Sequence, residues 1–317
     1  MALLKLLRLK ISKNDGMFKN FISVTIPAYN EENVIAKAIN SVLKSNYKNY
    51  EIIVVNNGST DRTREIAEGF AKKHPQKIKL LNYDPDPSKE FIKKRGVAFS
   101  RNRGAEAAKG SMLFFLDSDD WVREDTLESI AKTFQKYKDI DFVCGDRRTA
   151  IPKNWRRIFL YCWMTRKKFR RRPNKILYTG PFCPYIIRTK EFFRAGCFDE
   201  KAYYREDIAF ARKLEKLKTP KLDSGDIIYY TDMGTHFKDY KRQCSNMAKG
   251  FFIYPFKAIG VFMQMLMFSL SLPVMYLALF SAMMRRTGDV FVSICSPFLW
   301  GMRRFLEIFH FIKLLLK

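Results

Sequence analysis

Three aspartates directly after an apolar run carry the most specific chemistry in this sequence. The run at 112–116 (MLFFL) is followed by DSDD at 117–120. Carboxylates this close together repel one another unless a cation offsets their charge. A hard divalent cation such as Mg²⁺ or Mn²⁺ does so with oxygen ligands and commonly binds substrate phosphates as well. The alternative is a cap for a following helix, where Asp is favoured.

A second acidic pair, Glu206 and Asp207, lies in the segment YREDIAF. A carboxylate can act as a general base that takes the proton from an attacking hydroxyl. The same pair can instead open a helix, because the helix dipole stabilises acidic side chains in the first turn. Considered without its surroundings, the pair favours the helix start.

These groups need a scaffold, and the first 145 residues alternate apolar runs with amphipathic stretches. We predict strands at 23–26, 51–55, 78–81, 112–116 and 141–144, and helices at 31–43, from about 61, at 98–109 and at 124–137. Such strands, joined by single helices, indicate a mostly parallel sheet covered on both faces. Ligands bind beyond the carboxyl ends of such strands. Those ends carry Tyr29-Asn30, Asn56-Asn57 and the DSDD cluster.

Six stretches, in this order, resemble the family 2 glycosyltransferases of the GT-A fold. They are VTIPAYNEE (24–32), EIIVVNNGSTDRT (51–63), SRNRGAEAAKG (100–110), FLDSDD (115–120), GCFDE (196–200) and the Glu206-Asp207 pair. Each stretch alone is weakly specific, whereas all six in the family's order are highly specific. The resemblance runs from about Ser23 to Thr235 and implies a GT-A, Rossmann-like α/β catalytic domain.

The resemblance also implies which residues bind the nucleotide-sugar donor. Pro27 and Tyr29 would line the nucleoside pocket, with Glu31 beside them in the same stretch. Asn57 would face the base, and Arg101 would approach the donor diphosphate.

The acidic residues would carry the reaction itself. Asp117 would bind ribose or help organise the metal, and Asp119 would be the ligand of Mg²⁺ or Mn²⁺. A metal that bridges two phosphates neutralises the charge that builds as the nucleoside diphosphate leaves. Asp207, next to Glu206, would take the proton of the acceptor hydroxyl as it attacks the anomeric carbon. Direct displacement would invert that carbon.

Two departures from the family's pattern matter. Asn56 and Asn57 stand where the family usually has Asp at one or both positions, and an amide adds donors that a carboxylate lacks. The choice of uracil as base therefore stays open. Gln243 has no Arg-Trp after it, unlike the Gln-x-x-Arg-Trp motif of processive members, so polymerisation of a chain is not supported. His236 is assigned no role, because a lone His is more often structural.

The charge balance predicts a polyanionic partner. Lys and Arg total 58 against 32 Asp and Glu, a formal charge of +26. The stretch 147–190 has fourteen basic and no acidic residues, and 240–317 is basic and otherwise strongly apolar. A basic, apolar end suits a bilayer surface better than a nucleic-acid groove. We therefore predict membrane lipid, and no nucleic acid, as a partner.

A long uncharged run predicts how the chain meets the membrane. Residues 258–284 carry no charge over 27 positions, enough to cross a bilayer core of ~30 Å. Pro273 could kink a span or turn a re-entrant hairpin. The alternative is a buried helical subdomain. We predict an amphipathic segment at 1–20, the GT-A domain at 21–240 and a helical membrane region at 241–317.

These observations together predict a metal-dependent, inverting glycosyltransferase of the hexosyltransferase type. It would use a nucleotide-sugar donor and a lipid-linked or glycan acceptor at the cytoplasmic face of the cell membrane, in cell-envelope glycan biosynthesis. The closest alternative is a polyprenyl-phosphate glycosyltransferase, in which the acceptor is a lipid phosphate. A non-catalytic basic membrane-binding protein is disfavoured because the acidic cluster repels polyanions. A glycosidase would need two carboxylates but no nucleotide pocket.

Overall fold

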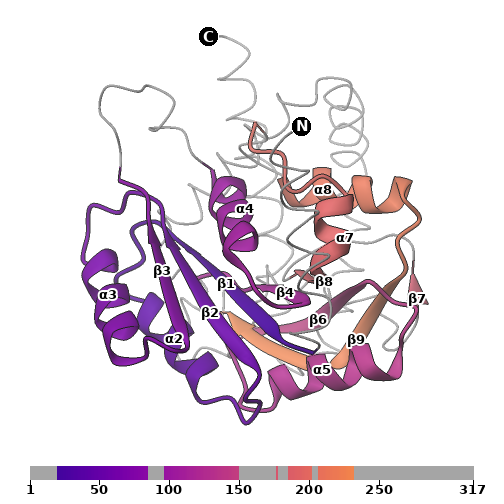
Figure 1. Ribbon diagram of the computed structural model, residues 1–317, viewed down its shortest axis with the longest axis horizontal. Helices are drawn as coiled ribbons and strands as arrows, with labels where there is room; N and C mark the ends of the chain where they lie inside the picture. The colour runs from indigo at the N-terminus through magenta and orange to yellow at the C-terminus, as the bar shows by residue number, and fades with distance from the viewer. Residues whose placement is uncertain (1–19, 85–95, 150–175, 178–184, 202–205, 232–317) are drawn as a thin grey trace, which may run out of the picture. The chain divides into compact units, whose positions relative to one another are not determined.

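The computed structural model describes residues 20–84, 96–149, 176–177, 185–201 and 206–231, which form helices around one mixed sheet (Figure 1). Within these ranges the nine strands are β1 (Ile22–Ala28), β2 (Tyr50–Asn56), β3 (Ile78–Asn82), β4 (Met112–Phe115), β5 (Asp120–Val122), β6 (Phe142–Thr149), β7 (Ile176–Leu177), β8 (Tyr185–Arg188) and β9 (Lys221–Thr231). The helices of the same ranges are α2 (Ile35–Leu43), α3 (Thr63–Lys73), α4 (Val97–Ala107), α5 (Thr126–Lys136), α7 (Thr189–Arg194) and α8 (Glu206–Lys216).

The sheet has a parallel and an antiparallel half. Neighbouring strands run parallel in the order β3-β2-β1-β4. Beyond β4 the order continues β8-β6-β9-β5, with β4–β8, β6–β8 and β5–β9 antiparallel. The predicted parallel sheet is confirmed for the first four strands. The sheet as a whole is mixed, because β8 runs antiparallel to β4 and β6, and β5 and β7 run antiparallel to β9.

Alternating side chains of the strands supply a hydrophobic core on each face of the sheet. Phe114 belongs to a core that includes buried residues of α2, α3 and α5. Its neighbours Leu113 and Phe115 belong to a second core with buried residues of α4, α7 and α8. In Figure 1, α4, α7 and α8 are seen above the sheet and α2 and α5 below it. The prediction that both faces are covered is therefore confirmed, and it explains why β4 has no polar alternation.

Gly104 sets the distance between α4 and the sheet. A Cβ at this position would lie 2.0 Å from Cγ2 of Thr25, a fully buried residue of β1. Well-packed interiors cannot absorb such an overlap without moving backbone. The absence of a side chain at Gly104 thus lets α4 lie directly on β1.

Gly104→Ala is expected to destabilise the fold by about 1–3 kcal/mol, the usual cost of overpacking. Thr25→Ala removes Cγ2, after which the nearest Thr25 atom, Cβ, is 3.1 Å away. The double variant should therefore recover part of the loss in a denaturation midpoint. The matched control is Gly69→Ala in α3, where nothing lies within 4 Å and alanine should be neutral or stabilising. Equal midpoints for Gly104→Ala and Gly69→Ala would contradict the close approach.

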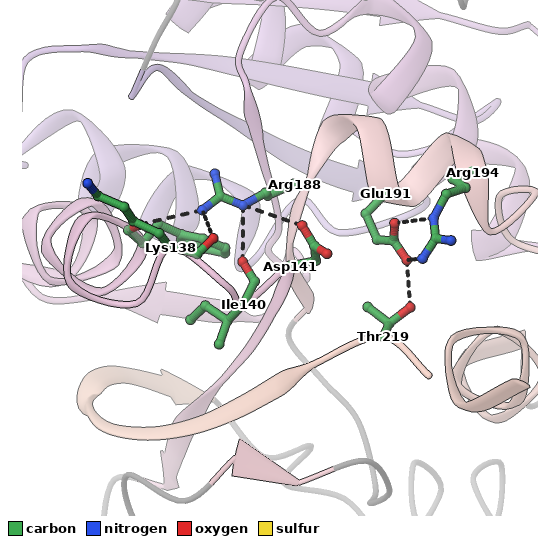
Figure 2. Close-up of polar contacts among 8 residues, drawn as sticks. Lys138, Ile140, Asp141, Arg188, Glu191, Arg194 and Thr219 are labelled. Atoms are coloured by element: carbon green, nitrogen blue, oxygen red, sulfur yellow. Dashed lines mark hydrogen bonds and ion pairs between the residues drawn. The ribbon is translucent and has the colours of Figure 1, made fainter. Parts of the chain in front are cut away.

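Arg188 ties β8 to the segment after α5, and Glu191 ties α7 to Thr219 (Figure 2). Arg188, the last residue of β8, donates to backbone carbonyls at and beyond the end of α5 and pairs with Asp141 at 3.5 Å. Glu191 of α7 accepts two bonds from Arg194, at 2.6 and 2.7 Å, and one from Thr219 at 2.5 Å. Burial, and then the nearby Glu191, raise the pKa of Asp141. The Arg188 contacts and the Thr219–Glu191 hydrogen bond thus join β8 and α7 to segments distant in sequence.

The predicted membrane region falls beyond the described part of the chain. The described helices include none with the length and apolar character needed to cross a bilayer. The uncharged run 258–284, His236 and Gln243 lie outside the described residues, as does the segment 1–19. The membrane span and the three-part domain division therefore stay predictions.

Candidate active site

The carboxyl ends of three adjacent strands bring the predicted site residues to one edge of the sheet. In the register of β1 and β2, Ala28 lies opposite Asn56, and the Asn57 amide donates to the Ala28 carbonyl at 2.9 Å. On the other side of β1, the Leu116 amide donates to the Thr25 carbonyl at 3.0 Å. The loops after β1 and β2 and the acidic cluster after β4 therefore leave the sheet side by side. This edge is where parallel α/β sheets bind ligands.

Several hydrogen bonds join the loop after β1 to the loop after β2. Asn30 donates its amide to Ser59 Oγ at 3.0 Å, and its side-chain oxygen accepts from the Thr60 amide at 2.8 Å. The amide of Glu31 donates to Thr63 Oγ1 at 2.7 Å. Asn30 and Gly58 both adopt positive φ, 57° and 75°, a conformation that Asn and Gly tolerate best. The two loops predicted to line the nucleoside pocket are thus hydrogen-bonded to each other.

The residues predicted to bind the nucleoside differ in exposure. Pro27 is buried within β1, and its missing N–H is tolerated because the paired register of β1 with β4 ends at Thr25. Tyr29 is 58% exposed and therefore available to a ligand. Asn56 is buried and donates to the Asn82 side chain at 3.2 Å, across the β2–β3 pair. This leaves Asn57, half-buried, as the better candidate to meet a base.

The acidic cluster fits a divalent cation. Asp117, Asp119 and Asp120 can each offer a carboxylate oxygen, and these three oxygens lie within 4.8 Å of one another. A tight turn brings them together, since the Asp120 amide donates to the Asp117 carbonyl at 3.0 Å. Asp117 and Asp119 are half-buried and Asp120 is buried. Carboxylate oxygens gathered in this way are the ligands that Mg²⁺ and Mn²⁺ prefer.

The alternative of a helix cap for this cluster is wrong. The cluster is followed by β5, and α5 begins only at Thr126. The N-cap of that helix is Asp125, five residues beyond Asp120. The three aspartates therefore do not serve the helix that follows.

Arg101 joins the acidic cluster to the second acidic pair. From α4, its Nη2 donates to Asp117 at 2.7 Å and its Nη1 donates to Glu206 at 2.7 Å. The Arg101 side chain is only 5% exposed, and the guanidinium lies 5.5 Å from the ring centroid of Phe198. Such charge-assisted bonds hold the partners in fixed geometry. The resemblance implies that Arg101 approaches the donor diphosphate, a role that stays a prediction.

Glu206 and Asp207 open α8, so the interpretation of the pair as a helix start is confirmed for its position. Glu206 is buried, and burial raises the pKa of its carboxyl although the Arg101 guanidinium opposes that shift. Asp207 is half-buried. The two carboxylates thus have different surroundings, with Glu206 bound to an arginine and Asp207 more open to a substrate. The general-base role of Asp207 stays a prediction.

Asn102 and Arg103, next to Arg101 in α4, bind the segment 198–200 through contacts that sequence reasoning missed. The Asn102 side chain exchanges two hydrogen bonds with the backbone of Phe198, both at 3.0 Å. Asn102 and Arg103 also donate to Glu200 at 2.9 and 2.8 Å. Both stretches are present in the sequence resemblance, as SRNRG and GCFDE, which was the available signal. Nothing local indicated that they touch.

Cys197 lies in the same turn and adopts a left-handed backbone conformation that usually favours glycine. Its φ is 57°, next to Gly196 at 78°. Burial raises the pKa of its thiol to about 11, helped by the nearby Glu106 carboxylate. A thiol held neutral in this way is a poor nucleophile, so we assign it no chemistry.

Comparison with known proteins agrees with this geometry. The model of the family described as glycosyl transferase family 2 matches residues 23–190, just over half of the chain. The uncharacterized glycosyltransferase EpsJ of Bacillus subtilis is 31% identical over 223 residues, which cover 66% of this chain and 60% of EpsJ. Glycosyltransferase GlyA of Streptococcus pneumoniae is 34% identical over 117 residues, 37% of this chain and 15% of GlyA. The chain spans less than two thirds of the length of these curated relatives.

Solved structures share the fold. S. aureus TarS 1–349 in complex with UDP-GlcNAc matches with a TM-score of 0.52 and 19% identity, over 92% of this chain and 89% of that one. The mannosyltransferase PcManGT from Pyrobaculum calidifontis, in complex with GDP-Man and Mn²⁺, has a TM-score of 0.55 and 16% identity, over 98% and 94% of the two chains. At such identities the likeness shows a GT-A-like α/β fold.

Proposed function

The chain belongs to glycosyl transferase family 2, and from that premise we propose that it transfers a sugar from a nucleotide-sugar donor to a lipid-linked or saccharide acceptor, with inversion. The observation that carries the proposal is the acidic cluster Asp117–Asp120 beside the hydrogen-bonded loops after β1 and β2. A phosphate-bearing ligand held in those loops would place its charges next to the carboxylates. Only a cation between the two makes that arrangement favourable.

Each residue of the site has a part in this reaction. Asp117, Asp119 and Asp120 would hold Mg²⁺ or Mn²⁺, which when bound offsets the negative charge of the leaving nucleoside diphosphate. Tyr29 and Asn57 would orient the nucleoside. Asp207 would accept the proton of the acceptor hydroxyl as that oxygen bonds to the anomeric carbon.

The donor is proposed by class and tested by screening. TarS is solved with UDP-GlcNAc and PcManGT with GDP-Man, so structures of this fold hold different bases. The test incubates the full chain with UDP-, GDP-, CMP- and dTDP-sugars, with Mn²⁺ or with chelator, and measures release of the free nucleotide. We expect metal-dependent release from one class of donor. Release from none of them, with or without added membrane lipid, would contradict the proposal.

We also propose that the enzyme works at the cytoplasmic face of the cell membrane, in cell-envelope glycan synthesis. The supporting observation is the sequence run 258–284, whose 27 uncharged residues are followed by two arginines. High salt or carbonate should then leave the full chain in the membrane fraction. The variant Leu270→Lys/Leu272→Lys should be released, since each charge at the centre of a span costs roughly 2.5–3.5 kcal/mol. Wild-type protein that stays in solution without detergent would refute this part.

A further inference from the structure

Three consecutive residues of α4 bind the two ends of the segment that runs from Phe198 to Glu206. Arg101 binds Glu206, Asn102 binds the Phe198 backbone, and Asn102 and Arg103 together bind Glu200. These partners lie about a hundred residues away in sequence, with separations of 96 to 105. A single turn of α4 therefore determines where α8, and with it Asp207, begins.

Helix α4 is a rigid support for this role. Gly104, the next residue, lets the helix lie against Thr25 of β1 without an intervening side chain. Buried Ala98 and Ala105 anchor the helix in the core that it shares with α7 and α8. A displacement of the Arg101 backbone relative to the sheet would require repacking of this core, which is costly.

The bridging geometry is specific to arginine. The two terminal nitrogens of Arg101 reach Asp117 on one side and Glu206 on the other, both at 2.7 Å. A lysine keeps the charge but has one nitrogen, a compact donor that cannot reproduce this planar fork. The side chains of Arg101 and Glu206 are 5% and 11% exposed, so little water is present to replace a lost bond.

We propose that Arg101 is a positioning residue that fixes Asp207 relative to the acidic cluster, and that Glu206 is its anchor rather than a proton acceptor. The inference rests on the proposed function, with Asp207 as the general base. Because a misplacement of about 1 Å can cost ~10²-fold in rate, loss of the bridge should lower kcat on that scale. A lysine still supplies a cation beside Asp117, and Asp119, Asp120 and the loops after β1 and β2 are unchanged, so KM for the donor should change far less than kcat. If Arg101 instead contacts the donor diphosphate directly, KM for the donor should rise and kcat should change little.

The first arm of the test needs no donor. Hydrogen exchange of the first protected amides of α8, from Phe210 onward, is measured in the full chain for wild type, Arg101→Lys and the control Arg64→Lys, because amides 206–209 have no acceptor inside the helix. Arg64 also bridges two carboxylates, Glu68 at 2.8 Å and Asp84 at 2.9 Å, but its side chain is 46% exposed. We expect exchange at the start of α8 to rise about tenfold or more in Arg101→Lys, as local protection is lost, and to stay unchanged in Arg64→Lys. Equal exchange in Arg101→Lys and wild type overturns the proposal.

The second arm measures kcat and KM with the donor that the screen identifies, and it distinguishes a positioning role of Arg101 from a role in donor binding. Arg101→Lys alone should lower kcat by ~10²-fold while KM for the donor stays within about threefold. In the Asp207→Asn background the same change should lower kcat no further, because Arg101 acts through Asp207. A raised KM, or a further large fall in that background, would instead mean that Arg101 serves the donor, and would overturn the inference. If no donor is found, the proposed function fails while the exchange result still decides the positioning role.

Discussion

Asp119→Asn is expected to abolish metal-dependent nucleotide binding while the fold survives. The substitution keeps the size of a half-buried side chain but removes one of three carboxylates that lie within 4.8 Å of one another. Changes to groups that only support a metal ligand already cost 10- to 100-fold in affinity, so loss of a direct ligand should cost more than ~10²-fold. Titration calorimetry of UDP and GDP, with and without Mn²⁺, measures the effect.

The control is Asp125→Asn, an aspartate that lies just before α5 and pairs with Arg123. It should bind nucleotide like the wild type. The circular dichroism and the thermal midpoint of Asp119→Asn should match those of the wild type, because the cluster lies at an edge of the sheet and not in its core. Full activity of the wild type in excess chelator would refute a metal role for Asp119.

The second large effect is expected for Asp207→Asn. The variant should bind donor normally but transfer sugar ~10²-fold or more slowly, the scale of a lost general base. Asparagine cannot accept the hydroxyl proton, while it preserves the size of the side chain in the first turn of α8. The rate of transfer under saturating donor measures the loss, and Asp226→Asn, an exposed position of β9, is the control.

The outcome also separates two classes of acceptor. A hydroxyl must lose its proton as it attacks, whereas a lipid phosphate is already ionised and needs no base. Transfer by Asp207→Asn at the wild-type rate would therefore argue for the polyprenyl-phosphate alternative. A loss that is restored neither by metal nor by donor would support a hydroxyl acceptor.

Local sequence determined the parallel half of the fold and the edge that carries the site. The apolar runs at 51–55 and 112–116 became β2 and β4 almost without change, and α2 follows the predicted periodicity from Ile35. Such elements are readable because burial of one face or both imposes a pattern on neighbouring residues. Because the carboxyl ends of adjacent parallel strands meet, polar residues after those runs predicted the edge at which β1, β2 and β4 end.

The antiparallel half was decided by tertiary structure. Strand β5 has three residues and β8 has four, too few for a pattern, and each exists through a distant partner, as in the pairing of Asp120 with Thr231. The predicted strand at 141–144 appears as β6, which runs in the same direction as β4 but is separated from it by the antiparallel strand β8. Cross-strand pairing of this kind depends on register between remote segments, which no local window contains.

The candidate site shows the same contrast between what local sequence predicts and what tertiary structure decides. The types and spacing of Asp117, Asp119 and Asp120 were sufficient to predict a cation site, whereas only the resemblance indicated Asp207 as a base. That Glu206 is bound by Arg101 across 105 residues, and is not equivalent to its neighbour Asp207, came only from the packing of α4 against α8. Adjacent residues of a helix point in different directions, so identical charges receive different surroundings once the core determines which of them is buried.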